Sequence, residues 1–189
     1  MLSSSLQDHP WPLVQWGVVL GAALLAAVSD IRSRRIPNAL TLPLLALGLL
    51  QAWAVAGTRG IADSMLGCTL AGLPYVLLFL YAGGGAGDAK LMGALGAWLG
   101  LIHSLALLLA VSVAGIGFGL LYARSHGRLR EALESFVGVF WTTTASVLGG
   151  GGFSSAFKPT SPPPESALKM PYGVAIFLGS LLATGSVLL

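Results

Sequence analysis

The chain has 189 residues, of which 55% are hydrophobic and 9% are charged, and its formal net charge is +3. Its mean hydropathy of +0.82 is far too high for a soluble domain of ordinary composition. Nucleic-acid binding has no support, because the basic residues are few and lie at the ends of apolar runs. The single cysteine, Cys68, lies in such a run and excludes a disulfide framework and a cysteine-based metal site.

Five long runs contain no Asp, Glu, Lys or Arg. They are Leu13–Val28, Ala39–Ala56, Met65–Ala82, Leu91–Ala123 and Met170–Leu189. A membrane-crossing helix needs about 20 apolar residues, and the runs lack the alternation of a transmembrane β-strand. We therefore expect an all-α, polytopic membrane protein with a single transmembrane domain over residues 1–189. The first run is expected to be a retained span, because no basic residue precedes it.

The run Leu91–Ala123 predicts two helices rather than one. As a single helix it would reach about 50 Å, whereas the hydrocarbon core of a bilayer is about 30 Å thick. We expect a turn near Gly100–Ser104, and small residues such as Gly96 and Gly100 favour close helix packing. Six transmembrane spans are then predicted, at about residues 12–29, 38–57, 62–82, 89–101, 103–123 and 170–189.

The basic residues orient these spans. The three basic groups are Arg32, Arg34 and Arg35; Arg124, Arg128 and Arg130; and Lys158 and Lys169. The positive-inside rule predicts that all three groups are cytoplasmic and that the N-terminus is outside. Two spans separate the first group from Lys90, so Asp30 and Asp88 are predicted to lie at the same, cytoplasmic face. Asp63 belongs to the opposite face and is expected to be a loop charge.

Residues 131–168 differ from the rest of the chain. Apolar residues recur at helical spacing between Leu133 and Leu148, which predicts a cytoplasmic helix lying in the membrane interface. One more re-entrant helix is the alternative for this segment. The sequence "GGGGFSSAFKPTSPPPES" that follows predicts a flexible, proline-rich loop.

Asp30 and Asp88 are the two acids that could converge at one face of the membrane. Two carboxylates close together cannot both ionise easily, so a pair can share one proton, as aspartic proteolysis requires. Glycines at positions 83, 84, 85 and 87 would leave the backbone open to an extended peptide and permit a positive φ. The alternative is that both acids are ordinary interfacial charges, paired with Arg32 or Arg34 and with Lys90.

Three segments carry a resemblance to a known family. They are "SDIRSRRIPNALTLP" (Ser29–Pro43), "GAGDAKLMGALGAWLG" (Gly85–Gly100) and "KMPYGVAIFLG" (Lys169–Gly179). In this order and on one face, they resemble the type IV prepilin peptidase family, the GxGD class of membrane aspartic proteases. The GxGD pattern alone is weak, and the combination of the three segments is specific.

The resemblance implies an endopeptidase that removes the short basic leader of type IV prepilins or pseudopilins, typically after a glycine, at the cytoplasmic face. Asp30 and Asp88 would be the catalytic pair, and Gly85 and Gly87 would shape the active-site loop. Lys90 matches a family position and would bind an acidic residue of the substrate or a lipid headgroup. The expected partners are therefore a prepilin and membrane lipid.

The chain also departs from the longer members of that family, which carry paired Cys-x-x-Cys motifs and methylate the new N-terminus. Here eleven residues precede the first expected span and Cys68 stands alone, so we expect peptidase activity without N-methylation. The short form resembles the peptidases of tight-adherence (Flp-type) pili, and archaeal preflagellin peptidases are also short. No metal or other cofactor is expected, because the three histidines are scattered.

Two other function classes are compatible with an apolar chain that carries few acids. A small proton-coupled transporter would place acids deeper in the spans and show an inverted repeat, and neither feature is visible in the sequence. A non-catalytic subunit of a pilus or secretion assembly would not need both aspartates.

Overall fold

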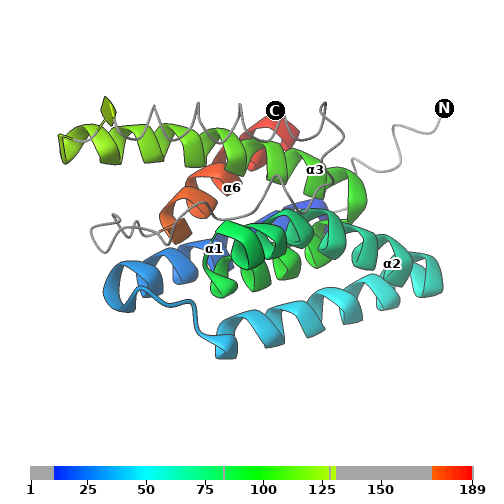
Figure 1. The fold of residues 1–189 in the computed structure, drawn as a ribbon. Helices are drawn as coiled ribbons and strands as arrows, with labels where there is room; N and C mark the ends of the chain where they lie inside the picture. Colours follow the sequence, from blue (N-terminus) through cyan, green and yellow to red (C-terminus); the bar gives the residue numbers. More distant parts are fainter. Residues whose placement is uncertain (1–10, 83, 128, 131–171, 189) are drawn as a thin grey trace, which may run out of the picture.

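The computed structural model describes residues 11–82, 84–127, 129–130 and 172–188. Within this part of the chain four long helices follow one another: α1 (Trp11–Ser33), α2 (Asn38–Ala82), α3 (Ala86–Ser125) and α6 (Tyr172–Leu188) (Figure 1). The predicted all-α class is confirmed. The interfacial helix and the flexible loop predicted for residues 131–168 lie outside the described residues.

The described helices have the length and composition of membrane-spanning helices. Three segments are apolar enough to cross a bilayer: Leu13–Ser33, Asn38–Leu80 and Ala86–Ser125. A shorter apolar helix covers Tyr172–Val187. Large apolar side chains such as Leu25, Leu109 and Leu121 are more than half exposed, as expected of surfaces that face lipid tails. The protein is therefore a membrane protein, while the number of six spans stays a prediction.

Both α2 and α3 are interrupted. They contain 45 and 40 residues, which at about 1.5 Å per residue is roughly twice the thickness of the hydrocarbon core. In α2 the helix breaks at Ala56 and Gly57, and in α3 it breaks at Gly100, within the predicted turn. Gly57 has a φ of 58° and Gly100 a φ of 71°, a left-handed conformation that glycine adopts without a steric cost.

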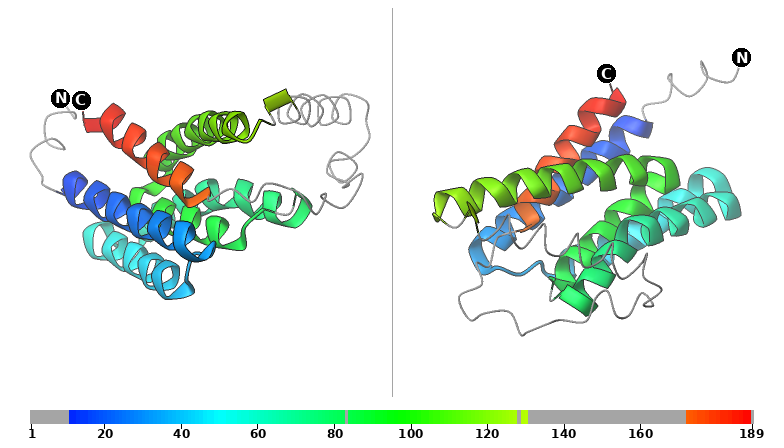
Figure 2. Two further views of the ribbon diagram at one scale, coloured as in Figure 1. Left: turned by 90° about the vertical axis from the view of Figure 1, so that its left-hand side faces the viewer. Right: turned by 45° about the horizontal axis from the view of Figure 1, so that its top comes forward.

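The first part of α3 is the centre of the bundle. Residues 91–100 are all buried, and α2 and α3 share the most extensive interface among the described helices (Figures 1 and 2). The two backbones meet at Gly67 and Gly96, where a Cβ on either glycine would overlap the other residue's carbonyl oxygen. This contact agrees with the close packing predicted for Gly96, because only glycine allows two helices to approach this far.

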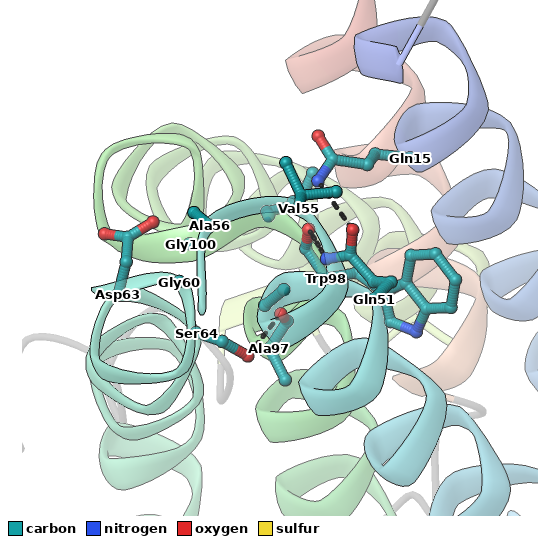
Figure 3. Close-up of a pocket in the computed structure, with 12 residues that line it drawn as sticks. Gln15, Gln51, Val55, Ala56, Gly60, Asp63, Ser64, Ala97, Trp98 and Gly100 are labelled. Atoms are coloured by element: carbon teal, nitrogen blue, oxygen red, sulfur yellow. Dashed lines mark hydrogen bonds between the residues drawn. The ribbon is translucent and has the colours of Figure 1, made fainter. Parts of the chain in front are cut away.

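A small pocket of about 120 Å³, lined by both polar and apolar residues, lies at the end of the bundle that carries the two breaks (Figure 3). Ser64 Oγ donates a hydrogen bond to the Ala97 carbonyl oxygen at 2.6 Å. Gln15 Nε2 donates to Gln51 Oε1 at 3.3 Å, and Gln51 Nε2 donates to the Trp98 carbonyl oxygen at 3.4 Å. These bonds connect α1, α2 and α3 at this end.

Asp63 caps the second part of α3 and is not a loop charge, contrary to the interpretation from the sequence. It lies within α2, and its Oδ1 accepts a hydrogen bond of 3.2 Å from the Leu101 backbone N–H, directly after the break at Gly100. Its Oδ2 occupies the space that a Cβ on Gly100 would need. A carboxylate at a helix start satisfies an otherwise unpaired N–H group and interacts favourably with the helix dipole.

This capping role predicts a difference between two substitutions. Asp63→Ala should lower the free energy of unfolding by about 1 kcal/mol, because the Leu101 N–H loses its side-chain acceptor. Asp63→Asn retains an acceptor oxygen and should stay close to the native protein. Thermal unfolding of both variants in one detergent measures the difference, and equal stability of the two would contradict the capping role.

Candidate active site

Asp30 lies in the last turns of α1 and is held by the first residues of α6. Its side chain is 8% exposed, and its Oδ2 accepts a hydrogen bond of 2.8 Å from the backbone N–H of Gly173. The first N–H groups of a helix have no partner within the helix and carry a partial positive charge. The start of α6 therefore stabilises the negative charge of the Asp30 carboxylate.

Gly173 leaves the space that this contact needs. A Cβ at position 173 would lie 3.0 Å from Asp30 Cβ and 3.2 Å from Asp30 Oδ2. The contact of a side chain here would be tighter than ordinary van der Waals contact, so Asp30 would have to move by a few tenths of an ångström. This contact thus explains the glycine in the "PYG" sequence at the start of α6.

Asp88 lies in the first turn of α3, two residues after the helix begins. A Cβ on Gly85 would lie 2.5 Å from Asp88 Oδ2, so the carboxylate occupies the space that glycine leaves free. Gly85 has a φ of −78°, so the expectation that these glycines supply a positive φ is wrong at this position. Glycine is needed at position 85 because of the carboxylate beside it.

The connection between α1 and α2 packs against the start of α3. A Cβ on Gly87 would lie 3.1 Å from Ile36 Cβ, and Lys90 Nζ donates a hydrogen bond of 2.9 Å to Asn38 Oδ1. The "IPN" and "GAGDAK" sequences, about 50 residues apart in the chain, are therefore in direct contact. This contact brings the end of α1, and with it Asp30, close to the start of α3.

The two carboxylates lie close enough for their charges to interact. Two tyrosines complete the surroundings of Asp88: Tyr75 from α2 and Tyr172 from α6, whose ring centroids are 6.0 Å apart in an edge-on contact. Tyr75 is 6% exposed, and the Tyr172 hydroxyl lies against Gly115 of α3. Four helices thus contribute to one site.

The structure places Asp30, Asp88, Gly85, Gly87 and Lys90 together at one end of the bundle. Asp63 and the break at Gly100 lie at the other end, about 18 Å from Asp88 along the axis of α3. The two aspartates thus lie at a common end of the bundle, and the cytoplasmic placement of that end stays a prediction. Their catalytic role stays a prediction.

The alternative of simple interfacial ion pairs finds no support in the described part of the chain. There, the side-chain partners of Asp30 and Lys90 are the Gly173 N–H and the Asn38 amide oxygen. The described part of the chain contains no group of three His, Cys, Asp or Glu side chains that could hold a metal ion.

Several contributors to this site have little signal in the sequence. Tyr75 is marked there only by a phenol inside the apolar run Met65–Ala82. Tyr172 and Gly173 belong to the segment Lys169–Gly179, whose resemblance to the family implies no role for either of them.

The fold and the site together define a class of protein: a helical membrane protein with two interacting carboxylates at one end of its bundle. The model of the type IV leader peptidase family matches residues 17–120, which is more than half of the chain. The chain belongs to this family, and the resemblance noted from the three segments is confirmed.

Curated relatives share this region. A protein of Pectobacterium carotovorum named prepilin leader peptidase/N-methyltransferase is 38% identical over 111 residues, covering 53% of this chain and 39% of the relative. The protein of that name from Xanthomonas campestris pv. campestris is 31% identical over 143 residues, covering 67% of this chain and 50% of the relative. The chain thus spans about two fifths to one half of the length of these relatives. No solved structure matches the chain.

The contact between Asp30 and Gly173 predicts different effects of alanine at two glycines of α6. Gly173→Ala should destabilise the protein by about 1–3 kcal/mol, because the added methyl group displaces Asp30 from its buried position. Gly185→Ala should be neutral or slightly stabilising, since nothing lies within 4 Å of that position and alanine favours the helix. Unfolding curves of the two variants in the same detergent provide the comparison, and a stable Gly173→Ala variant would contradict the packing described here.

Proposed function

We propose that the chain is a membrane aspartic endopeptidase that removes the short basic leader of type IV prepilins or pseudopilins. The observation that carries this proposal is the convergence of Asp30 and Asp88, from two different helices, into one interacting pair. The names of the relatives supply the substrate class, and the geometry of this chain supplies a chemistry that fits it.

The two carboxylates have different surroundings, which suits different roles. The Gly173 N–H stabilises the negative charge of Asp30, so Asp30 is proposed as the base that takes a proton from water. Asp88 then carries the shared proton and donates a hydrogen bond to the oxygen of the scissile carbonyl group. The water oxygen attacks the carbonyl carbon, and the departing amine receives the proton that Asp30 accepted.

The surroundings of the pair fit a peptide substrate. Gly84 and Gly85 are exposed and have no side chain, so an extended backbone can approach Asp88 from this side. Tyr75, which is buried, and Tyr172 border Asp88. The side that the two glycines leave open would admit the scissile bond to the two carboxylates.

The proposed orientation places the pair at the cytoplasmic face of the inner membrane and the N-terminus outside. Arg32, Arg34 and Arg35 follow Asp30 directly, and all three are exposed. We also propose that the chain supplies peptidase activity without N-methylation, since a carboxylate pair activates water but plays no part in methyl transfer. A transporter would instead need acids along a path through the bundle.

The chemistry predicts the effect of removing either carboxylate. Asp30→Asn and Asp88→Asn should each lower the rate of leader cleavage by at least about 1,000-fold, because asparagine keeps the shape but cannot exchange the proton. Cleavage of a co-expressed prepilin, followed by its mobility shift on a gel, measures this loss. Mass spectrometry of the product should also show a new N-terminus without the mass of an added methyl group.

Three matched variants control this experiment. Asp63→Asn lies at the other end of the bundle and should cleave normally, and Glu131→Gln lies outside the proposed pair and should cleave normally as well. Lys90→Ala should have a milder effect, because it removes a single docking charge. Near-normal cleavage by either Asp30→Asn or Asp88→Asn, at matched expression, would refute the proposed pair.

The orientation has its own test. In a Cys68→Ala background, cysteines introduced at Ser33 and Ser125 should be protected from an impermeant thiol reagent in intact cells, while one at Thr58 should react. All three positions are exposed on the described structure, so burial within the protein does not limit the reaction. Reaction of the cysteine at position 33 from outside would overturn the cytoplasmic placement.

A further inference from the structure

Two tyrosines of the candidate active site have no part in the chemistry proposed above. Tyr75 belongs to the part of α2 that follows the break at Gly57, and Tyr172 is the first residue of α6. Their rings meet edge-on with centroids 6.0 Å apart, and both phenols interact electrostatically with Asp88. Two phenols beside a carboxylate that takes part in the reaction raise the question of a catalytic role.

The packing of α2 on α3 places Tyr75 at the level of Asp88. Gly72 lies three residues before Tyr75 and therefore on the same face of α2. A Cβ on Gly72 would lie 3.5 Å from the Ala89 carbonyl oxygen and 3.2 Å from Gly93 Cα. The two helices run in opposite directions on either side of a short connection, so the next turn of α2 faces the first turn of α3. That turn carries Asp88.

The start of α6 places Tyr172 next to the other carboxylate. Tyr172 directly precedes Gly173, whose backbone N–H donates the 2.8 Å hydrogen bond to Asp30. From this position its ring contacts the ring of Tyr75. The tyrosine pair therefore connects the segment that holds Asp30 with the surroundings of Asp88.

The hydroxyl of Tyr172 has a hydrogen to donate. Tyr75 is 6% exposed, and its hydroxyl donates a hydrogen bond to the Tyr172 hydroxyl. This bond uses an acceptor position of Tyr172 and leaves the single O–H hydrogen of Tyr172 for another group. The Tyr172 side chain is partly exposed, and its hydroxyl lies against Gly115, which has no side chain to accept that hydrogen.

The proposed reaction has a place for such a donor. When the water oxygen adds to the scissile carbonyl carbon, the electron pair of the C=O bond moves to the carbonyl oxygen, which becomes negatively charged. Asp88 supplies one hydrogen bond to this oxygen in the proposed mechanism. A second donor would stabilise the charged oxygen more than the uncharged carbonyl group, and such a difference lowers the barrier of the chemical step.

We propose that Tyr172 is a catalytic residue that donates the second hydrogen bond to the scissile carbonyl oxygen, and that Tyr75 is a positioning residue that orients its hydroxyl. This inference rests on the proposed function. Tyr172 keeps its proton throughout, so the proton still passes from water to Asp30 and then to the departing amine. The hydrogen bond from Tyr75 also strengthens Tyr172 as a donor, because hydrogen bonds in a chain polarise one another.

Phenylalanine tests this role, because it removes each hydroxyl and keeps the ring that packs at the site. The substrate is a synthetic precursor with a short basic leader, a glycine and an apolar helix, cleaved in proteoliposomes. Tyr172→Phe should lower kcat about 100-fold, as expected for the loss of one oxyanion donor, with KM within about twofold of the native value. Tyr75→Phe should lower kcat about tenfold, because the Tyr172 hydroxyl loses its orientation.

Tyr122→Phe is the matched control. This tyrosine lies in the last turns of α3, where its ring stacks on His126, and it takes no part in the site. The variant should keep the native kcat and KM. Thermal unfolding in one detergent verifies that all three phenylalanine variants are folded.

A tetrahedral mimic separates a catalytic role of Tyr172 from a structural one. In a phosphinic analogue of the precursor, a phosphorus atom with two oxygens replaces the carbonyl carbon that water attacks. A donor to the charged oxygen contributes to binding of the mimic as it does to the transition state. In Tyr172→Phe, the inhibition constant of the analogue should therefore rise by about the same factor as kcat/KM falls.

The outcomes distinguish this inference from the peptidase assignment. A native kcat in Tyr172→Phe, at matched amounts of folded protein, would overturn the inference and leave the assignment intact. A raised KM with unchanged kcat, or a greater loss of kcat in Tyr75→Phe than in Tyr172→Phe, would also overturn the inference alone. Absence of cleavage by the folded native protein would overturn the peptidase assignment and this inference with it.

Discussion

The hydrogen bond between Asp30 and the Gly173 N–H is the interaction on which the rest of the site depends. It joins two residues that are 143 positions apart, at the end of α1 and the start of α6. A buried carboxylate without such a partner would be strongly unfavourable. Because this bond fixes the start of α6, it also fixes Tyr172, which packs between Tyr75 and Gly115 and borders Asp88. A change that separates the Gly173 N–H from Asp30 would therefore disturb both carboxylates.

Glycines build this site by leaving space. Gly173 makes room for Asp30, Gly85 for the carboxylate of Asp88, and Gly87 for Ile36. In each case the atom that would collide with a Cβ belongs to a residue of the site or to the segment that supports it. The GxGD sequence therefore has a structural explanation in this chain, because its two glycines allow the aspartate and the "IPN" segment to approach the start of α3.

Much of this architecture could be predicted from local sequence, and some of it could not. Hydropathy and charge are local properties, so the all-α class, the break at Gly100 and the common end for Asp30 and Asp88 were predictable. The capping of Leu101 by Asp63 and the contact of Gly173 with Asp30 were not, because each depends on two segments that meet only after folding. Tyr75 was missed for the same reason. The count of six spans and the segment 131–168 remain predictions.

The most direct measurement of the central claim is a double-mutant cycle on the carboxylate pair. It compares kcat/KM of the native protein with Asp30→Asn, Asp88→Asn and the variant that carries both substitutions, using one precursor and matched amounts of folded protein. If the two carboxylates act as one unit, the double variant should be no more than about tenfold slower than either single variant. Two losses that multiply, each of them partial, would show that the carboxylates act independently and would contradict the account.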